Sequence, residues 1–276
     1  MRMKALSFWA VICAVLYAAP LRSQSPEFEA ATIKPTKLVN AGVKNACHGI
    51  DSKFAPRDLA ATVPLGRCVI SSGRLSHMIG VAYNVPMDVL EGGPGWVKNG
   101  EDRFDLEAKA ENPATAREAD LQTMLQNLLA DRFKLKFHWE TREIDGFQLL
   151  VAPGGPKFHE AKPDEEEQLS YGFLALAYTN RLIFNAGKDS NVPQLPVTSS
   201  FQKVSMARFA QVLLPAAGRH VEDRTNLKGF YDFTVVAQPG EAISGPLEKQ
   251  LGLKLERRKI AINFFIVDSA EKPAPN

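Results

Sequence analysis

The sequence predicts an α+β protein built from two repeated units, each with two helices packed on a small, mostly antiparallel sheet. Three ordered similarities between residues 75–151 and 206–267 favour this prediction. Both segments contain a helical stripe, then an alternating strand, then a second helix that leads directly into another strand. Coincidence is the competing interpretation, because helices and strands alternate in many proteins.

The first predicted helix of each unit has apolar residues at the spacing of a helix with one buried side. The two stripes are Leu75, Met78, Ile79, Ala82 and Tyr83, and Met206, Phe209, Ala210, Leu213 and Leu214. Ser205 immediately precedes the second stripe, where its hydroxyl can accept a free amide of the first turn. In the first unit, Thr115 to Glu118 has the pattern of a capping box and predicts the start of the second helix.

A strand with one buried face follows the first helix in each unit. Its apolar residues alternate with polar ones and are Phe104, Leu106 and Ala108, and Tyr231, Phe233 and Val235. The alternation is typical of a strand with one face in water. Asp105 and Asp232 fall at equivalent positions, which predicts a shared structural role, such as a turn hydrogen bond, rather than catalysis.

Each unit is expected to close with a β-hairpin after its second helix. The helix-to-strand transition is marked by Leu129, Phe133, Leu135 and Phe137 and by Leu247, Leu251, Leu253 and Leu255, where the apolar spacing changes from four to two. We expect the first hairpin to turn near Asp145-Gly146, a dipeptide common in turns. The second is expected to turn at Arg257-Arg258-Lys259.

Residues 1–23 have the pattern of a secretory signal peptide, with a basic start and an apolar core from Ala5 to Ala19. This core is shorter than the roughly 20 residues of a membrane-spanning helix, although an uncleaved anchor is an alternative. The remaining chain divides into a first unit at 24–157, an irregular connection with a possible hairpin at 158–203, and a second unit at 204–276. We expect the mature protein in the periplasm or outside the cell.

The charge of the mature chain argues against functions that need a strongly basic protein, such as binding nucleic acid. The full sequence has 33 basic and 31 acidic residues. Removing residues 1–23 takes away three basic residues, Arg2, Lys4 and Arg22, and leaves 30 basic against 31 acidic. A nearly neutral chain generates no strong field for nucleic acid or anionic lipid. We therefore predict no nucleic-acid partner and no stable membrane span after signal cleavage.

Export leaves two cysteines, Cys47 and Cys68. In an oxidising compartment such a pair predicts a disulfide. Closing a loop of this length would stabilise the fold by roughly 3 kcal/mol in the chain-entropy model. Two free, buried thiols are the alternative, and a redox pair is disfavoured because the sequence has no C-x-x-C spacing.

The sequence shows no recognisable catalytic, cofactor-binding or metal-binding constellation. The histidines never occur at the spacing of metal ligands, and neither a G-x-S-x-G elbow nor a Gly-rich phosphate loop is present. The segment from Gly92 to Trp96 is typical of a tight turn closed by an aromatic side chain. An exposed Trp96 would also suit a recognition anchor.

Ordered motifs along nearly the whole mature chain resemble an exported, soil-associated family that is expanded in Acidobacteria and carries a domain of unknown function. The motifs are Phe28–Pro35, Gly92–Trp96, Arg103–Ala110, Leu128–Leu135, Gly154–Lys157, Gly229–Thr234 and Gln250–Glu256. Members also occur fused to an M56-type (BlaR1-like) membrane metallopeptidase sensor. This chain lacks H-E-x-x-H, so peptidase activity does not carry over, and the resemblance supplies no catalytic residues. Residues 206–267 also resemble, in element order alone, the short N-terminal docking domain of secretins and TonB-dependent receptors.

These observations favour a non-enzymatic envelope protein that needs no cofactor and binds a partner protein or small ligand. A sensory module of an envelope-stress pathway is one alternative, suggested by the fused family members. An exported hydrolase is the other. That reading requires His138 or His220 to lie within hydrogen-bond reach of a carboxylate and a hydroxyl.

Overall fold

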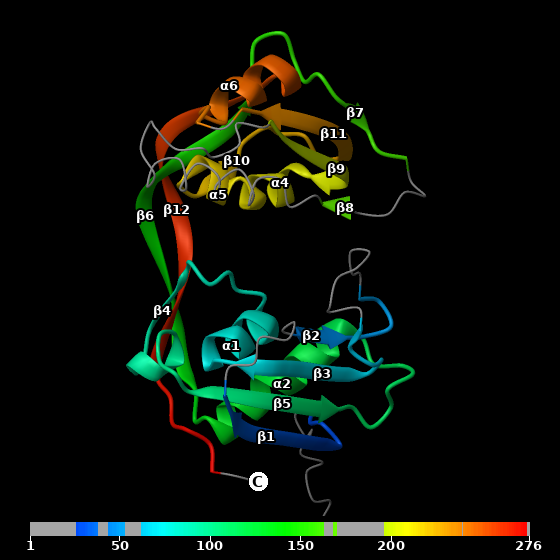
Figure 1. Ribbon diagram of the computed structural model, residues 1–276, viewed down its shortest axis with the longest axis vertical. Helices are drawn as coiled ribbons and strands as arrows, with labels where there is room; N and C mark the ends of the chain where they lie inside the picture. The colour runs from blue at the N-terminus through cyan, green and yellow to red at the C-terminus, as the bar shows by residue number, and fades with distance from the viewer. Residues whose placement is uncertain are drawn as a thin grey trace, which may run out of the picture.

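The computed structural model describes residues 26–37, 44–52, 62–162, 168–169, 196–238 and 240–274. The expected signal peptide at 1–23 and most of the connection at 158–203, including its possible hairpin, lie outside the described residues. Figure 1 shows a sheet with its helices at each end of the molecule, and two long strands that run between them. Within the described ranges, no helix combines the length and apolar character needed to cross a bilayer.

The first sheet is antiparallel and has the order β1-β5-β3-β2. Its strands are β1 (Ala30–Thr36), β2 (Asn45–His48), β3 (Arg67–Gly73) and β5 (Arg103–Lys109). Two helices, α1 (Leu75–Tyr83) and α2 (Glu118–Arg132), pack against each other and against β2 and β3. The predicted apolar stripe of α1 is buried except for Tyr83, which is partly buried.

The start of α2 differs from the prediction, because the capping residue comes from another part of the chain. The helix begins at Glu118 rather than at Thr115. Asp51 Oδ1 accepts the amide of Glu118 at 2.8 Å, and its Oδ2 accepts Arg117 Nε at 2.9 Å. These hydrogen bonds hold the pKa of the Asp51 carboxyl below its usual range. Asp120, at the third helical position, also accepts the Arg117 amide at 3.4 Å, whereas the contribution of Asp51 comes from a distant loop and leaves no signal in the helix sequence.

The second sheet is antiparallel, with the order β7-β11-β9-β8. Its strands are β7 (His159–Glu160), β8 (Gln168–Leu169), β9 (Val197–Ser205) and β11 (Phe230–Ala237). Its helices are α4 (Met206–Val212), α5 (Leu214–Ala217) and α6 (Ser244–Pro246), which continues as a π-helical turn, η3 (Leu247–Leu251). The predicted cap of α4 is confirmed, since Ser205 Oγ accepts the Arg208 amide at 3.2 Å.

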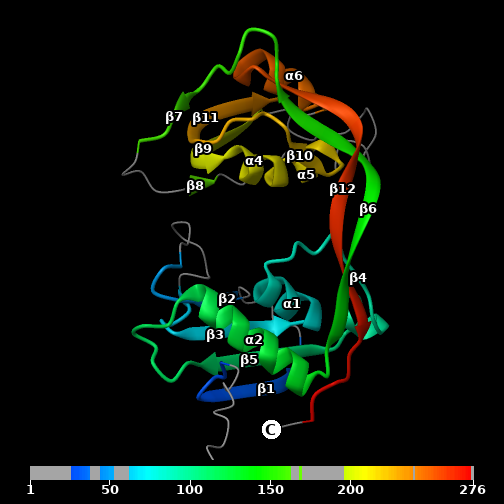
Figure 2. The same ribbon diagram turned by 180° about the vertical axis from the view of Figure 1, so that it is seen from behind.

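The third sheet links the two ends and has the order β10-β6-β12-β4. Its strands are β4 (Leu90–Gly92), β6 (Lys136–Val151), β10 (Val221–Asp223) and β12 (Leu253–Ser269). The long strands β6 and β12 pair antiparallel along nearly their whole length, whereas β4 and β10 add short parallel edges. We call the paired β6 and β12 the ribbon, which twists between the two end sheets in both views (Figures 1 and 2).

The prediction of two repeated α+β units is wrong, because the described chain is mostly β and forms three sheets. Residues 136–151 and 253–269 do not fold back as two separate hairpins. Each forms one continuous strand, and the two strands pair with each other across the assumed repeat. Neither end of the molecule is therefore a separate unit closed by its own hairpin. The two long strands instead pair with each other in a third sheet.

The two expected turns are strand interior for identifiable reasons. A β-carbon on Gly146 would lie 2.6 Å from Ile260 Cγ1, closer still to Ile260 Cδ1, and 2.8 Å from the His220 carbonyl oxygen. Glycine is therefore present for a close approach between strands, not for a turn. The basic run starting at Arg257 lies inside β12, where Lys259 Nζ pairs with Asp145 Oδ1 at 3.2 Å.

Asp105 and Asp232 have the shared structural role that the sequence predicts. Asp105 Oδ1 accepts the amide of Ser72 at 2.6 Å, and Asp232 Oδ1 accepts the amide of Lys203 at 2.7 Å. Ser72 and Lys203 have φ of 51° and 48°, and each lies where the strand register shifts before a helix. Each carboxylate thus satisfies a backbone donor that the bulge removes from the ladder.

Two hydrophobic clusters form the core, and the ribbon contributes to both. The first cluster joins α1, α2 and the first sheet with Phe265 and Val267 near the end of β12. The second joins the second sheet and its helices with Leu149 of β6 and Leu253 of β12. Each end of the ribbon therefore contributes buried side chains to one of the two cores.

Candidate functional site

The middle of the ribbon has one face whose side chains are exposed, except for Phe265, the buried cross-strand partner of Trp139. Side chains of a strand alternate between faces, and residues paired across two strands share a face. The registers Thr141↔Asn263 and Asp145↔Lys259 therefore place every second residue of both strands on one side. We call this side the exposed ribbon face; its members, all exposed, are Trp139, Thr141, Glu143, Asp145, Arg257, Lys259, Ala261 and Asn263.

The opposite face of the ribbon is mostly covered and has a structural role. Ile144 and Ile262 are partly buried there, and Ile260 is almost fully buried. Arg142 lies on this face, 4.9 Å above the Phe264 ring, and donates hydrogen bonds of 2.6 Å to carboxylates of β4 and β6. These hydrogen bonds raise the pKa of Arg142 above its ordinary value, so the guanidinium stays charged. The exposed ribbon face is thus the side available for contact.

Trp139 is the large aromatic residue of the exposed ribbon face, and 51% of its surface is accessible. Its ring meets Phe265 edge to face, with centroids 5.2 Å apart and an interplanar angle of 85°. Phe265 is fully buried and stacks on Phe137 at 4.2 Å. Because Phe265 is the cross-strand partner of Trp139, it holds the indole from the neighbouring strand on the same face, and half of the Trp139 surface remains accessible to solvent.

Polar groups with unused hydrogen-bonding capacity lie next to Trp139 on the same face. Thr141 Oγ1 donates to Asn263 Oδ1 at 2.7 Å, which orients the amide and leaves its nitrogen as a donor. Within the described part of the chain, this is the one hydrogen bond of the Asn263 side chain, and Glu143 has no ion-pair partner. An amide donor and a carboxylate acceptor are therefore both available.

The far end of the exposed ribbon face carries one acidic side chain, Asp145, and two basic ones, Arg257 and Lys259. Asp145 pairs with Lys259 at 3.2 Å and lies 3.9 Å from Arg257. The hydrogen bond from Lys259 holds the pKa of the Asp145 carboxyl below its usual range, and the cationic charges add to this effect. With Glu143, the face carries two acidic and two basic side chains, and so has no net formal charge.

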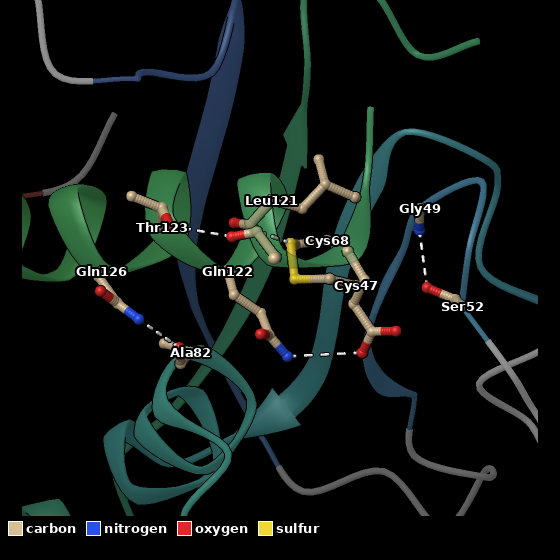
Figure 3. The surroundings of a disulfide bond; sticks show 11 residues. Cys47, Gly49, Ser52, Cys68, Ala82, Leu121, Gln122, Thr123 and Gln126 are labelled. Atoms are coloured by element: carbon tan, nitrogen blue, oxygen red, sulfur yellow. Dashed lines mark hydrogen bonds between the residues drawn. A yellow bond between two sulfur atoms is a disulfide. The ribbon is translucent and has the colours of Figure 1, made fainter. Parts of the chain in front are cut away.

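The predicted cysteine pair lies elsewhere and serves the fold. Cys47 of β2 and Cys68 of β3 are cross-strand partners joined by a disulfide, and both are buried. Figure 3 shows the disulfide against α2, with Cys68 Sγ 3.8 Å from the Leu121 carbonyl oxygen. Gln126 of α2 also donates to the Ala82 carbonyl of α1 at 2.8 Å. This region fixes the two helices on the first sheet.

Trp96 lies on a 3-10 helix, η2 (Gly95–Val97), rather than on the ribbon. Its ring is partly buried and stacks over Phe133 at 6.4 Å and meets Phe104 edge to face at 6.3 Å. These contacts give it a packing role, and a recognition role for Trp96 stays a prediction. Trp139 is a second aromatic candidate that sequence reasoning missed, because its spacing places it in phase with the apolar Leu135 and Phe137; the polar Thr141 and Glu143, in the same phase, were the available signal of an exposed face.

The two histidines proposed for a hydrolase do not meet each other. His138 Nδ1 lies 2.8 Å from Asp268 Oδ1, and His220 Nε2 lies 3.2 Å from Asp88 Oδ2. In the part of the chain that the structure describes, neither pair hydrogen bonds to a hydroxyl, so the three-group arrangement of a serine-type site is not assembled. The same residues also contain no cluster of three or more His, Cys, Asp or Glu side chains suited to a metal.

A family model described as "Protein of unknown function (DUF3738)" matches residues 76–270. The matched range includes both strands of the ribbon, and therefore every residue of the exposed ribbon face. No curated protein and no solved structure matches the chain.

Proposed function

This chain belongs to the family described as "Protein of unknown function (DUF3738)", and we propose that it is a non-enzymatic binding protein of the cell envelope. Its contact surface is the exposed ribbon face. Binding requires an accessible anchor held in a fixed orientation and polar groups with unsatisfied hydrogen bonds around it. The exposed ribbon face supplies each of these.

The observation that carries this proposal is the half-exposed indole of Trp139, packed edge to face against its buried cross-strand partner Phe265. Single exposed apolar side chains are common on protein surfaces. Trp139 differs because its cross-strand partner Phe265 packs against it, while Thr141 and Asn263 present hydrogen-bonding groups beside it. Tryptophan is also the residue type most enriched among side chains that dominate binding energy.

Placement in the envelope rests on three supports. Residues 1–23 have the pattern of a signal peptide, and the sequence resembles the exported family expanded in Acidobacteria. The buried Cys47–Cys68 disulfide is the kind of bond that persists in oxidising compartments. The resemblance to a family with members fused to M56-type sensor peptidases suggests a sensory module as the alternative role.

Site-specific photocrosslinking tests the proposal. A benzophenone amino acid replaces Ala261, in the middle of the exposed ribbon face, in cells of the native host. The matched control carries the same group at Ala119, an exposed alanine in the first turn of α2. Benzophenone inserts into C–H bonds of protein, glycan or lipid, so the assay does not presuppose the ligand.

We expect discrete adducts from position 261 and none from position 119, with the 261 adducts lost when Trp139→Ala is added. Absence of adducts at 261, or the same adducts at both positions, would refute the proposed contact surface. Turnover of ester, peptide, glycoside or phosphate substrates by the purified protein would refute the non-enzymatic assignment.

A further inference from the structure

We propose that the exposed ribbon face binds a linear, uncharged polysaccharide, with Trp139 as the platform on which one sugar ring stacks. This inference rests on the proposed function and names the class of its ligand. Four properties of the face support it, namely the accessible indole, the row of hydrogen-bonding groups, the length of the row and the absence of net charge.

The indole of Trp139 suits the apolar face of a pyranose ring. The C–H groups on one face of such a ring make weak but favourable contacts with an aromatic π-system. The edge-to-face contact with Phe265 leaves at least one face of the indole free of that ring. Because the contact with Phe265 already restricts the Trp139 side chain, stacking costs little further side-chain entropy.

The polar neighbours of Trp139 match the hydroxyl groups of a sugar. Each hydroxyl both donates and accepts a hydrogen bond. The Asn263 amide nitrogen offers a donor, the Thr141 hydroxyl retains acceptor capacity, and the Glu143 carboxylate offers strong acceptors. A hydroxylated chain can therefore use the hydrogen-bonding capacity that the described residues leave unused on this face.

The arrangement of these groups in a row favours a chain over a single sugar. Same-face residues on a strand repeat every ~6.8 Å, so the distance from Trp139 to Asp145 is roughly 20 Å along β6. Several consecutive sugar units can lie along such a row. Accumulated weak contacts would then give useful affinity without a deep pocket.

The charges on the face favour an uncharged chain. Glu143 and Asp145 together balance Arg257 and Lys259, so the side chains of the face carry no net formal charge that would attract a polyanion or a polycation. Glu143, the carboxylate without a partner among the described residues, repels an acidic sugar placed beside Trp139. A protein partner fits less well, because charged residues are depleted from the cores of protein interfaces, whereas Trp139 here has polar and charged neighbours.

Affinity electrophoresis of the purified mature protein tests this proposal. Native gels contain one soluble polysaccharide each, chosen from uncharged glucans, xylans and mannans, with polygalacturonate as the anionic comparison. We expect at least one uncharged polysaccharide to retard the protein. We expect Trp139→Ala to weaken that retardation at least tenfold, and Trp139→Phe to retain part of it.

Phe230→Ala is the matched control, since Phe230 on β11 is also 51% exposed but lies off the ribbon. It should bind as the unmodified protein does, and thermal unfolding of each variant verifies that it is folded. The blue shift of tryptophan fluorescence on adding the retarding polysaccharide should be lost in Trp139→Phe.

The proposal fails if no uncharged polysaccharide retards the protein, if only polygalacturonate does, or if retardation persists in Trp139→Ala. The two experiments together distinguish failure of the polysaccharide inference from failure of the proposed contact surface. Adducts from position 261 to a protein or to a second copy of this chain, without retardation by any uncharged polysaccharide, would refute the polysaccharide inference and leave the contact surface in place. Absence of adducts at 261 would remove both.

Discussion

Replacing Gly146 with alanine probes the closest approach inside the ribbon. The added methyl group would lie 2.6 Å from Ile260 Cγ1 and 2.8 Å from the His220 carbonyl oxygen, with Ile260 Cδ1 nearer than both. Ile260 is only 2% exposed, so its side chain has little room to rotate away. The His220 oxygen belongs to the backbone and accepts the Phe147 amide at 2.9 Å, so it is also held in place.

Overpacking of this kind typically costs about 1–3 kcal/mol. Because one of the clashing atoms is backbone, we expect Gly146→Ala to lower the free energy of unfolding by about 2–3 kcal/mol. Ile260→Val removes the nearest clashing atom and alone costs about 1 kcal/mol. The double variant should therefore lose about 1 kcal/mol less free energy of unfolding than the two single variants lose when their losses are added.

Urea unfolding followed by circular dichroism measures these differences. Gly95→Ala is the matched control, because nothing lies within 4 Å of a β-carbon at Gly95. Its free energy of unfolding should stay within about 0.5 kcal/mol of the unmodified protein. If Gly146→Ala were equally harmless, or if its effect simply added to that of Ile260→Val, the close approach would be refuted.

Three further predictions concern stability. Cys47→Ala combined with Cys68→Ala should lower the free energy of unfolding by about 3 kcal/mol, and a reducing agent should then have no further effect, as urea unfolding can check. Burial lowers the pKa of His77, with a further contribution from the nearby positive charge of Arg74, so the folded state favours neutral His77. Stability should therefore fall as pH drops below ~6.5 towards the lowered folded-state pKa, and His77→Gln should flatten this fall in unfolding midpoints between pH 7 and 5. Asp105→Ala should cost about 1–3 kcal/mol by leaving a bulge amide unsatisfied, whereas Asp105→Asn should cost less; equal losses would contradict the hydrogen-bond explanation.

Helices and caps could be predicted from the sequence where they depend only on residues within one short segment. The stripe starting at Leu75 repeats at helical spacing, and α1 buries four of its five members. Ser205 could be recognised as a cap because the amide it accepts is three residues away. Such features depend on neighbours in sequence, which periodicity and capping rules describe well.

The ribbon could not be predicted, because its pairing joins segments more than a hundred residues apart. Asp145-Gly146 has a composition common in turns, and a single sequence does not distinguish a turn glycine from one needed for close approach. The exposed ribbon face depends on the same pairing, since Trp139 and Asn263 share a side only when β6 and β12 are in register. The disulfide was easier to predict, because the expected export left just two cysteines.

The pairing of β6 with β12 underlies both the fold and the proposed surface, and an engineered disulfide measures it directly. Thr141 and Asn263 are cross-strand partners whose side chains meet at 2.7 Å. Thr141→Cys with Asn263→Cys should form a disulfide completely under mild oxidation, as mass spectrometry of non-reduced peptides can show. Thr141→Cys with Lys259→Cys, four residues out of register, should remain reduced. If the 141–263 pair stayed reduced, or if both pairs oxidised at the same rate, the ribbon would be contradicted, and with it the surface proposed for binding.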